Sequence, residues 1–292
     1  LSSVGSQLPT IYYIQGMNFI KFCASSAALL FLCSCDSNEV SLAFNTENAP
    51  VQKYFLESSL DAMLPSDSGV TVPEAMETHL KVQATLSELV AYDNGSGRFE
   101  MKIDSVEYKS DKHTVEDYLY IQKYLLTQHF QYKMAPDGSV SEPAVEDVAL
   151  QPGTEELNLL KLFMKVQPIL PGTPTKVGST WEREVQIPES GKTTSVYKSF
   201  TLEEVFMHDG AQMAKIGMNV KYREVADSSA NVQMESKGFI VGTGSILFDM
   251  THGVISTVNL DLQGHVNVTD LVVGSVIPDM HILQKIKLRS EF

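Results

Sequence analysis

Alternation of apolar and polar residues over long stretches restricts the fold of this chain more than any other feature of its sequence. The clearest stretch runs from Val254 to Thr269. The apolar residues that share one face of it are Val254, Val258, Leu260, Leu262, Val266 and Val268. Every second residue from Thr257 to Thr269 is polar and falls on the other face, and the stretch from Ala214 to Tyr222 repeats the pattern. A period of two with one apolar face indicates half-buried strands of an antiparallel sheet.

Turn residues separate the alternating stretches at the places where hairpins need them. The four clearest turns are Asp93–Gly97, Pro136–Gly138, His208–Gly210 and Thr251–Gly253. Each contains a glycine beside a short polar residue, the combination that tight hairpin turns favour. The sequence therefore predicts a succession of antiparallel hairpins.

Two stretches depart from this pattern. Thr154 is placed to cap a helix from Glu155 to about Val166, which Pro168 would end. Between His113 and Leu126, Thr114 and Asp117 have the spacing of a helix capping box, but the tyrosine and isoleucine content favours a strand equally. We therefore predict a mainly β fold, an antiparallel curved sheet or open half-barrel, with one or two short helices.

A weak internal repeat divides this β domain. The segment Thr85–Val90, its following turn and a strand through Lys109 are echoed by Thr201–Phe206, a turn and a strand through Tyr222. This echo favours two similar halves, residues 51–150 and 170–275. Chance likeness between two amphipathic hairpins explains it as well.

The stretch from Met17 to Ser34 has the layout of a secretory signal. Met17 and Lys21 precede a run of apolar and small residues that is too short for an ordinary transmembrane helix. The run ends in Leu32-Cys33-Ser34-Cys35, which resembles the lipobox of bacterial lipoproteins. The resemblance implies cleavage between Ser34 and Cys35 and acylation of Cys35. An uncleaved anchor and an ordinary secretory signal are the alternatives.

This leader sets the expected division of the chain. Residues 1–16 precede a credible initiator and are interpreted as an upstream extension from a mis-called start. Residues 17–34 form the signal peptide, 35–50 an acylated polar tether, and 51–292 the β-rich envelope domain. The expected location is the cell envelope, with the lipid anchor as the contact to the membrane. The outer membrane or a periplasmic face is favoured over the inner membrane, and the choice of leaflet stays open.

Charge and cysteine content exclude several classes of protein. The whole chain carries a net charge of −14, and Lys21 is the one charged residue before position 36, so the remainder carries −15. Such an acidic chain does not neutralise phosphates, so nucleic acid is not an expected partner. The cysteines, Cys23, Cys33 and Cys35, all lie in the leader, so the expected mature domain has no disulfide and no thiolate metal ligand.

A second resemblance rests on the motif Val177-Gly178-Ser179-Thr180-Trp181. Together with the segments Phe130–Gly138 and Phe248–Ile255, this V-G-x-x-W motif is similar to uncharacterised bacterial periplasmic and lipoprotein families. The resemblance implies a strand-rich domain similar to the lipoprotein-carrier fold, an open half-barrel around a hydrophobic cavity. From the residues themselves, Gly178 permits a turn and Trp181 packs over the end of the core. Trp181 is also the one candidate ligand-facing side chain.

No candidate catalytic or cofactor motif in the sequence has the spacing or geometry that its chemistry needs. The seven histidines lack metal-binding spacing, and His208 and His252 are interpreted as turn residues. Ser195 and Lys198 match S-x-x-K, but three residues apart on a strand they face opposite sides. Glu88 and Glu204 are a candidate carboxylate pair, with solvated strand faces as the alternative. No metal, cofactor or catalytic residue is therefore predicted.

These observations lead to two functional hypotheses. The first is a non-enzymatic lipoprotein whose β domain binds an envelope protein or a lipid-like ligand. The second is a hydrolase of envelope glycans or peptides that uses carboxylates from several strands. A purely structural surface protein is a third alternative.

Overall fold

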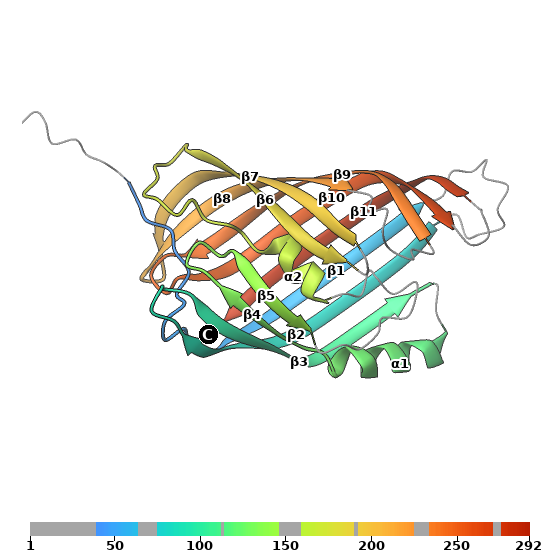
Figure 1. The fold of residues 1–292 in the computed structure, drawn as a ribbon, viewed down its shortest axis with the longest axis horizontal. Helices are drawn as coiled ribbons and strands as arrows, with labels where there is room; N and C mark the ends of the chain where they lie inside the picture. Colours follow the sequence, from blue (N-terminus) through green and yellow to red (C-terminus); the bar gives the residue numbers. More distant parts are fainter. Residues whose placement is uncertain are drawn as a thin grey trace, which may run out of the picture. The chain divides into compact units, whose positions relative to one another are not determined.

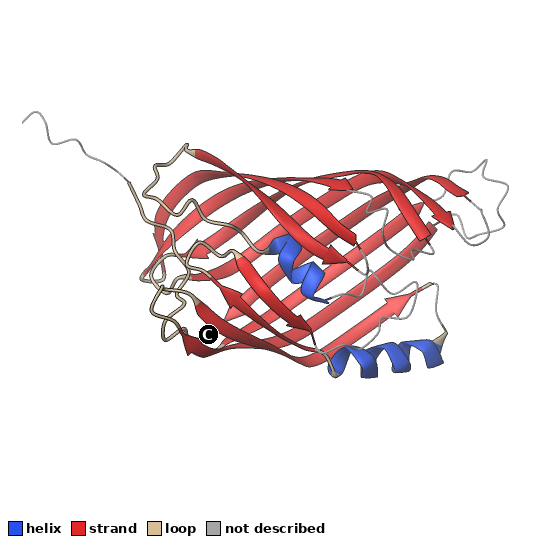
Figure 2. Ribbon diagram, viewed as in Figure 1, coloured by secondary structure: helices blue, strands red, loops and turns tan. Residues whose placement is uncertain are grey.

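The described part of the chain forms one open antiparallel sheet with two helices. The computed structural model describes residues 39–63, 75–111, 114–145, 159–189, 192–224, 234–270 and 276–292. The strands are β1 (Gln52–Met63), β2 (Ala75–Ala91), β3 (Gly97–Ser110), β4 (His129–Met134), β5 (Val140–Val145), β6 (Thr180–Glu189), β7 (Lys192–His208), β8 (Ala211–Glu224), β9 (Met234–Asp249), β10 (Val254–Asp270) and β11 (Val276–Glu291). The helices are α1 (Val115–Leu126) and α2 (Leu159–Val166). Figures 1 and 2 show the long strands and the two helices.

The eleven strands follow the order β5-β4-β3-β2-β1-β11-β10-β9-β8-β7-β6. Strands β5 and β6 are the two edges, so the sheet does not close on itself. The predicted mainly β class, with an open curved sheet and few helices, is confirmed. At its centre the first strand pairs with the last, with Tyr54 opposite Ser290.

The tight turns gather at one end of this sheet. Because neighbouring strands are antiparallel and mostly consecutive in the chain, the turns that join β2 to β3, β4 to β5, β7 to β8 and β9 to β10 lie at a common end, which we call the turn end. All four predicted turns are present there, and Gly95, Gly138, Gly210 and Gly253 each have a positive φ. The glycine in each turn supplies the left-handed conformation that other residues rarely adopt.

The predicted alternation is also confirmed. The buried residues of β8 include Ala214, Ile216, Met218, Val220 and Tyr222, and those of β10 include Val254, Val258, Leu260, Leu262 and Val266. Residues between them, such as Lys215 and Asn259, are exposed. One face of the sheet is therefore packed and the other is in water.

The packed face surrounds α2, which lies in front of the long strands in Figure 1. Its buried residues are Leu159, Leu160, Leu162, Phe163, Met164 and Val166. Phe163 packs against Tyr54 of β1 with ring centroids 6.0 Å apart. The predicted helix ending before Pro168 is present over its described residues, while positions 154–158 lie outside them.

The segment from His113 to Leu126, for which helix and strand were equally favoured, is a helix from Val115 onward. Thr114 caps it: its hydroxyl accepts from the Asp117 backbone N–H, and the Asp117 carboxylate accepts from the Thr114 backbone N–H. Ile121 and Leu125 are buried, whereas Val115, Leu119 and Tyr120 are exposed. This capping box satisfies the first N–H groups of α1, which explains why the helix prevails over the strand.

Residues 39–50, the described part of the segment 35–50 that is predicted to be an acylated tether, are bonded to the domain. Val40 forms a bridge with Thr175, and the backbone N–H groups of Phe44 and Asn45 donate to carbonyls of the turns at Pro136 and Gly253. Leu42 and Phe44 are buried, and the Phe44 ring meets the edge of Phe248 at 5.2 Å. We call residues 39–50 the strap, because they cross the turn end from one turn to the next. The polar composition of this segment concealed a short apolar alternation at positions 40, 42 and 44.

The internal echo corresponds to two hairpins, β2–β3 and β7–β8. Their register irregularities fall at different places, at Gln83/Ala84 and Glu88/Val90 in the first and at Leu202/Glu204 in the second. The two copies therefore share topology and turn position but differ in local pairing, and the division into two similar halves stays a prediction.

Glycines on the packed side of β9 and β10 mark where these two strands approach each other most closely. A Cβ on Gly242 would lie 2.6 Å from the Asp261 carbonyl oxygen and 2.4 Å from Leu262 Cδ2. A Cβ on Gly217 of β8 would instead meet the flexible end of the Glu203 side chain at 2.5 Å. Backbone atoms move only at a cost, whereas a surface side chain rotates away.

We expect Gly242→Ala to lower the free energy of unfolding by about 1–3 kcal/mol, because overpacking at a backbone contact forces strand displacement. Gly217→Ala is the matched control, and it should be neutral or stabilising by about 0.5 kcal/mol because it restricts the unfolded chain. Urea titration followed by circular dichroism measures both. Equal destabilisation by the two changes would contradict this explanation.

Candidate functional site

Lys198 is the most unusual polar residue of the packed face. It lies on β7, is 1% exposed, and its ammonium group donates to the carbonyl oxygens of Met164 at 2.8 Å, Lys165 at 2.9 Å and Gln167 at 2.8 Å. The carbonyl of Met164 would ordinarily accept from the residue four positions later, which is Pro168 and has no N–H. Lys198 therefore supplies the donors that the end of α2 lacks.

Burial lowers the pKa of Lys198 to about 7. The three carbonyl acceptors and the partial negative charge at the C-terminal end of α2 oppose this shift, because they favour the ammonium form. In the described residues that face it from α2, the contacts of Lys198 are backbone oxygens rather than carboxylates. Such a lysine acts as a buried cap of the C-terminal end of α2.

Further contacts fix α2 and the residues after it to distant strands. Lys165 donates to the Gln284 side chain of β11 at 2.9 Å, and Gln284 donates to Ser58 of β1 at 3.1 Å. Arg183 of β6 donates to the carbonyl oxygen of Pro171 at 3.0 Å. These bonds join α2 and the residues after it to β11, β1 and β6, so α2 is firmly held against the packed face.

Trp181 belongs to the same arrangement. Gly178 has a φ of +89°, which turns the chain into β6, and Trp181 follows as the second residue of that strand. Its indole N–H donates to the Ile169 carbonyl at 2.7 Å and its ring stacks on Phe200 at 5.5 Å. The side chain is buried, as expected of a residue that covers the core. A contact between Trp181 and a ligand stays a prediction.

A groove of about 920 Å³ lies on the sheet, spread over seven strands. Lys198 and Gln284 both lie at its floor and point to α2, so their neighbours along β7 and β11 point to the opposite face. The lining side chains on that opposite face are Asp61, Glu182, Glu184, Tyr197, Ser199, Asn219, Lys221, Val241, Thr243, Asp261, Gln263, Leu283 and Lys285. The groove is therefore on the face of the sheet that points away from α2.

The groove combines several kinds of binding group. Tyr197, Val241 and Leu283 offer apolar surface, and Thr243 and Gln263 offer hydrogen-bond donors and acceptors. Four carboxylates and two lysines line this face, so the groove carries an excess of negative charge. Its size is within the range of clefts that hold small molecules or peptide segments.

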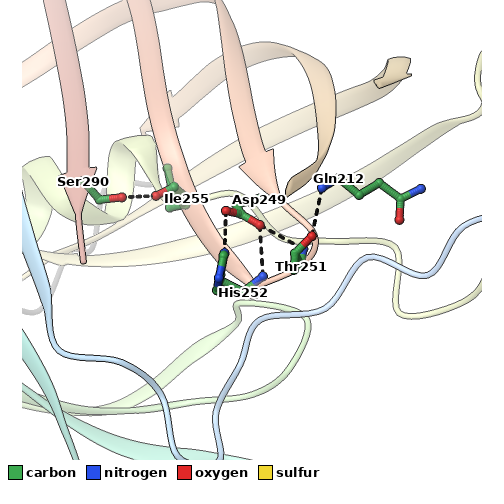
Figure 3. Close-up of polar contacts among 6 residues, drawn as sticks. All are labelled: Gln212, Asp249, Thr251, His252, Ile255 and Ser290. Carbon is green, nitrogen blue, oxygen red and sulfur yellow. Dashed lines mark hydrogen bonds and ion pairs between the residues drawn. The ribbon is translucent and has the colours of Figure 1, made fainter. Parts of the chain in front are cut away.

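A network of polar contacts orders the turn between β9 and β10 (Figure 3). The buried carboxylate of Asp249 accepts from the backbone N–H groups of Thr251 at 2.9 Å and His252 at 3.0 Å, and its other oxygen lies 2.8 Å from His252 Nδ1. The Thr251 hydroxyl accepts from the backbone N–H of Gln212 at 2.8 Å. Ser290 at the end of β11 donates to the Ile255 carbonyl.

This network fits a structural role better than a catalytic one. The Asp249 carboxylate is used by two backbone N–H groups, in the manner of an aspartate that closes a turn. His252 rests on the Phe292 ring at 4.8 Å, and Ser290 is engaged with a backbone carbonyl. His252 lies within the turn between β9 and β10, and His208 is the last residue of β7, directly before the turn to β8.

The candidate catalytic pairs are not assembled. Ser195 bonds to Gln186 on one side of β7, whereas Lys198 points to α2 on the other. Glu88 lies on β2 and Glu204 on β7, with five strands between them in the sheet. The Glu88 carboxylate instead accepts from the backbone N–H of Ala49 at 2.7 Å, which helps to hold the strap.

Several other predictions concern metals, spans and the leader. Among the residues that the structure describes, no group of three or more histidine, cysteine, aspartate or glutamate side chains is arranged to hold a metal ion. Within the same residues, no helix has the length and apolar character needed to cross a bilayer. Ser34 and Cys35 lie outside the described residues, so acylation of Cys35 stays a prediction.

Sequence reasoning missed the roles of Lys198 and of the groove. A hint was present for Lys198, because it occupies an inward position between Val196 and Phe200 on an alternating strand. A charged residue at such a position needs buried hydrogen-bond acceptors. Pro168 has no N–H, so the Met164 carbonyl in α2 is left as one such acceptor. The groove had no comparable signal, since its lining comes from seven strands.

Comparisons with known proteins give little guidance. No protein-family model matches the chain, and no curated protein matches it. Among solved structures, a double mutant of Rh. blastica porin is similar over 83% of this chain and 100% of its own, with a TM-score of 0.24 and 8% identity. A triple mutant of Rhodopseudomonas blastica porin has a TM-score of 0.25 and 5% identity over the same shares of the two chains. Likeness at this level carries no inference about the chain.

Proposed function

We propose that this chain is a lipid-anchored envelope protein that binds an extended segment of another envelope protein in the groove of β1 and β6–β11. The anchor would be Cys35, in the lipobox-like stretch Leu32-Cys33-Ser34-Cys35, as in the lipoprotein families that the sequence resembles. The domain would act without a cofactor. The observation that carries the binding proposal is the 920 Å³ groove on the face of the sheet that is otherwise in water.

The packed face supports this choice over the binding of a lipid-like ligand. A lipid carrier needs an apolar cavity, and here that side of the sheet is occupied by α2, whose carbonyls are bonded to Lys198. Removing α2 would leave those donors and acceptors without partners at a cost of several kcal/mol. The groove on the other face needs no such rearrangement.

The dimensions of the groove favour an extended polypeptide as its ligand. Seven strands spaced about 4.8 Å apart make the groove roughly 29 Å long, which matches about eight residues of extended chain. Apolar side chains such as Tyr197 and Val241 would contact alternate residues of the segment, and Thr243 and Gln263 would bond to its backbone. Carboxylates and lysines at intervals along the groove give it a charge pattern that selects among segments.

Hydrolysis is less well supported than binding. The acidic residues of the groove that the structure describes, Asp61, Glu182, Glu184 and Asp261, are exposed or partly exposed rather than buried in pairs. Glycosidase-like chemistry needs two carboxylates in different environments across one cleft. The groove therefore has the character of a recognition surface.

Photo-crosslinking in intact cells tests the proposal. A benzophenone amino acid at Tyr197, which is 39% exposed in the groove, should give an adduct with one envelope protein. The matched control is Phe239, which is 55% exposed on the same face of β9 but outside the groove, and it should give none.

A second pair of variants ties the adduct to the groove. Thr243→Trp should fill the groove and reduce the adduct at position 197 by at least about fivefold, since a bulky ring displaces a bound segment. Asn259→Trp places the same ring on an exposed position of β10 outside the groove and should leave the adduct unchanged. Adducts of equal yield at positions 197 and 239 would reject the groove as the binding site.

A further inference from the structure

The strap limits how far the domain can lie from its own anchor. Glu39 is held at the turn end, because its carboxylate pairs with Lys176 at 3.5 Å and the next residue, Val40, exchanges backbone hydrogen bonds with Thr175. Cys35 is four residues before Glu39. Four extended residues span at most about 14 Å. An acyl chain on Cys35 would therefore keep a membrane close to the turn end.

The opposite end of the sheet is much farther away. Strands β7 and β10 each contain 17 residues, which corresponds to about 56 Å of extended strand. A tether of about 14 Å cannot bridge that length. The anchored domain must therefore approach the membrane with its turn end.

Exposed apolar side chains form one group at this same end and a second group on α1. Of the thirteen large apolar residues that are exposed in the described part of the chain, seven lie at strand ends or loops of the turn end. They are Val51, Leu89, Val90, Tyr92, Val177, Met207 and Phe292. Met207 is 67% exposed and Val177 is 54% exposed, although each lies where a polar turn residue would be ordinary. This apolar fringe is independent of the lipobox.

From these two observations we infer that the turn end is a membrane-contacting surface, which inserts Val177 and Met207 into the interface of the bilayer that holds the lipid anchor. The inference rests on the acylation of Cys35 in the proposed function. It places α1 and the far ends of the long strands away from the bilayer. The groove then runs across the sheet above the membrane and is accessible to a partner from the side.

The charges of the turn end define the kind of lipid that fits. Glu47, Asp93 and Asp209 are exposed there, and Lys176 and Lys133 are engaged with Glu39 and the Tyr92 ring. Such a surface is repelled by anionic headgroups and gains its contact from apolar side chains. The expected partner is a bilayer of zwitterionic lipid, with contact that is insensitive to salt.

Site-specific fluorescence on the acylated full chain tests this inference. The expected mature chain has no cysteine other than the acylated Cys35, so single thiols can be introduced and labelled with an environment-sensitive fluorophore. The test sites are Val177→Cys and Met207→Cys. The matched controls are Leu119→Cys and Phe239→Cys, which are 64% and 55% exposed and lie away from the turn end.

In phosphatidylcholine vesicles, we expect spin-labelled lipid to quench about half of the emission at positions 177 and 207 and almost none at the control positions, since interfacial side chains insert about 5–10 Å. A quarter of phosphatidylglycerol should weaken the quenching. Equal quenching at all four positions, or quenching at the controls alone, would overturn the inference. A blue shift at position 207 without lipid would also overturn it, because a second copy of the chain would then cover this end.

Palmitate labelling separates failure of this inference from failure of the proposed function. Label that is incorporated into the wild-type chain and lost in Cys35→Ala, together with the quenching pattern above, supports both. Label without quenching at positions 177 and 207 overturns the membrane contact alone. A wild-type chain that takes up no label overturns the anchor and, with it, the inference.

Discussion

Replacing Lys198 by methionine is expected to lower the free energy of unfolding by about 3–5 kcal/mol. The change keeps the length of the side chain and removes the three donors that satisfy the carbonyls of Met164, Lys165 and Gln167. Each buried carbonyl left without a donor costs about 1–3 kcal/mol, and partial relaxation of α2 recovers some of that loss. Chemical denaturation measured by circular dichroism gives the difference directly.

The control for this change is Lys81→Met on β2, where the lysine is exposed and the expected effect is within about 0.5 kcal/mol. A second readout is the dependence of stability on pH. Because the pKa of Lys198 is lowered to about 7 in the folded chain, the unfolded chain binds more protons between pH 7 and the ordinary lysine pKa. Stability should therefore rise with pH across that window in the wild type and not in Lys198→Met. A variant as stable as the wild type would show that α2 does not depend on this lysine.

Replacing Trp181 by alanine is expected to cost about 3–5 kcal/mol, because it removes a large buried ring and leaves a cavity against Phe200. The bond from its indole N–H to the Ile169 carbonyl is lost as well. Trp181 is the single tryptophan of the chain, so unfolding must be followed by circular dichroism rather than by tryptophan fluorescence.

Trp181→Phe separates packing from hydrogen bonding. It retains an aromatic ring over Phe200 and removes the donor to Ile169, so the expected loss is about 1–2 kcal/mol. If this variant were as unstable as Trp181→Ala, the hydrogen bond rather than the ring would be the main contribution. The V-G-x-x-W motif would then serve chiefly to hold the chain after α2.

Local signals explain how much of the fold was predictable. The alternation in β8 and β10, the glycine turns and the capping box of Thr114 each depend on a few neighbouring residues, and each is present in the structure. The central pairing of β1 with β11 depends on residues more than two hundred positions apart, such as Tyr54 and Ser290. No local pattern encodes such a pairing, because it depends on which strand edges remain free.

The candidate site was less predictable for the same reason. The groove is assembled from alternate residues of seven strands, and each of them looks like an ordinary solvated position in its own strand. The docking of the strap was not predicted because Glu39, Asn45 and Glu47 dominate its composition, while the buried Leu42 and Phe44 between them hold it in place. Composition averages over a segment, whereas docking depends on which alternate residues face the sheet.

The pairing of the first strand with the last also has a consequence for biosynthesis. Because a chain is synthesised from its N terminus, β1 emerges more than two hundred residues before β11, its partner in the sheet. Until then the β1 backbone groups that later pair with β11 have no ladder partner, and unsatisfied strand edges invite association with other chains. Folding of this sheet therefore requires that β1 be kept apart from neighbouring chains until β11 has been made.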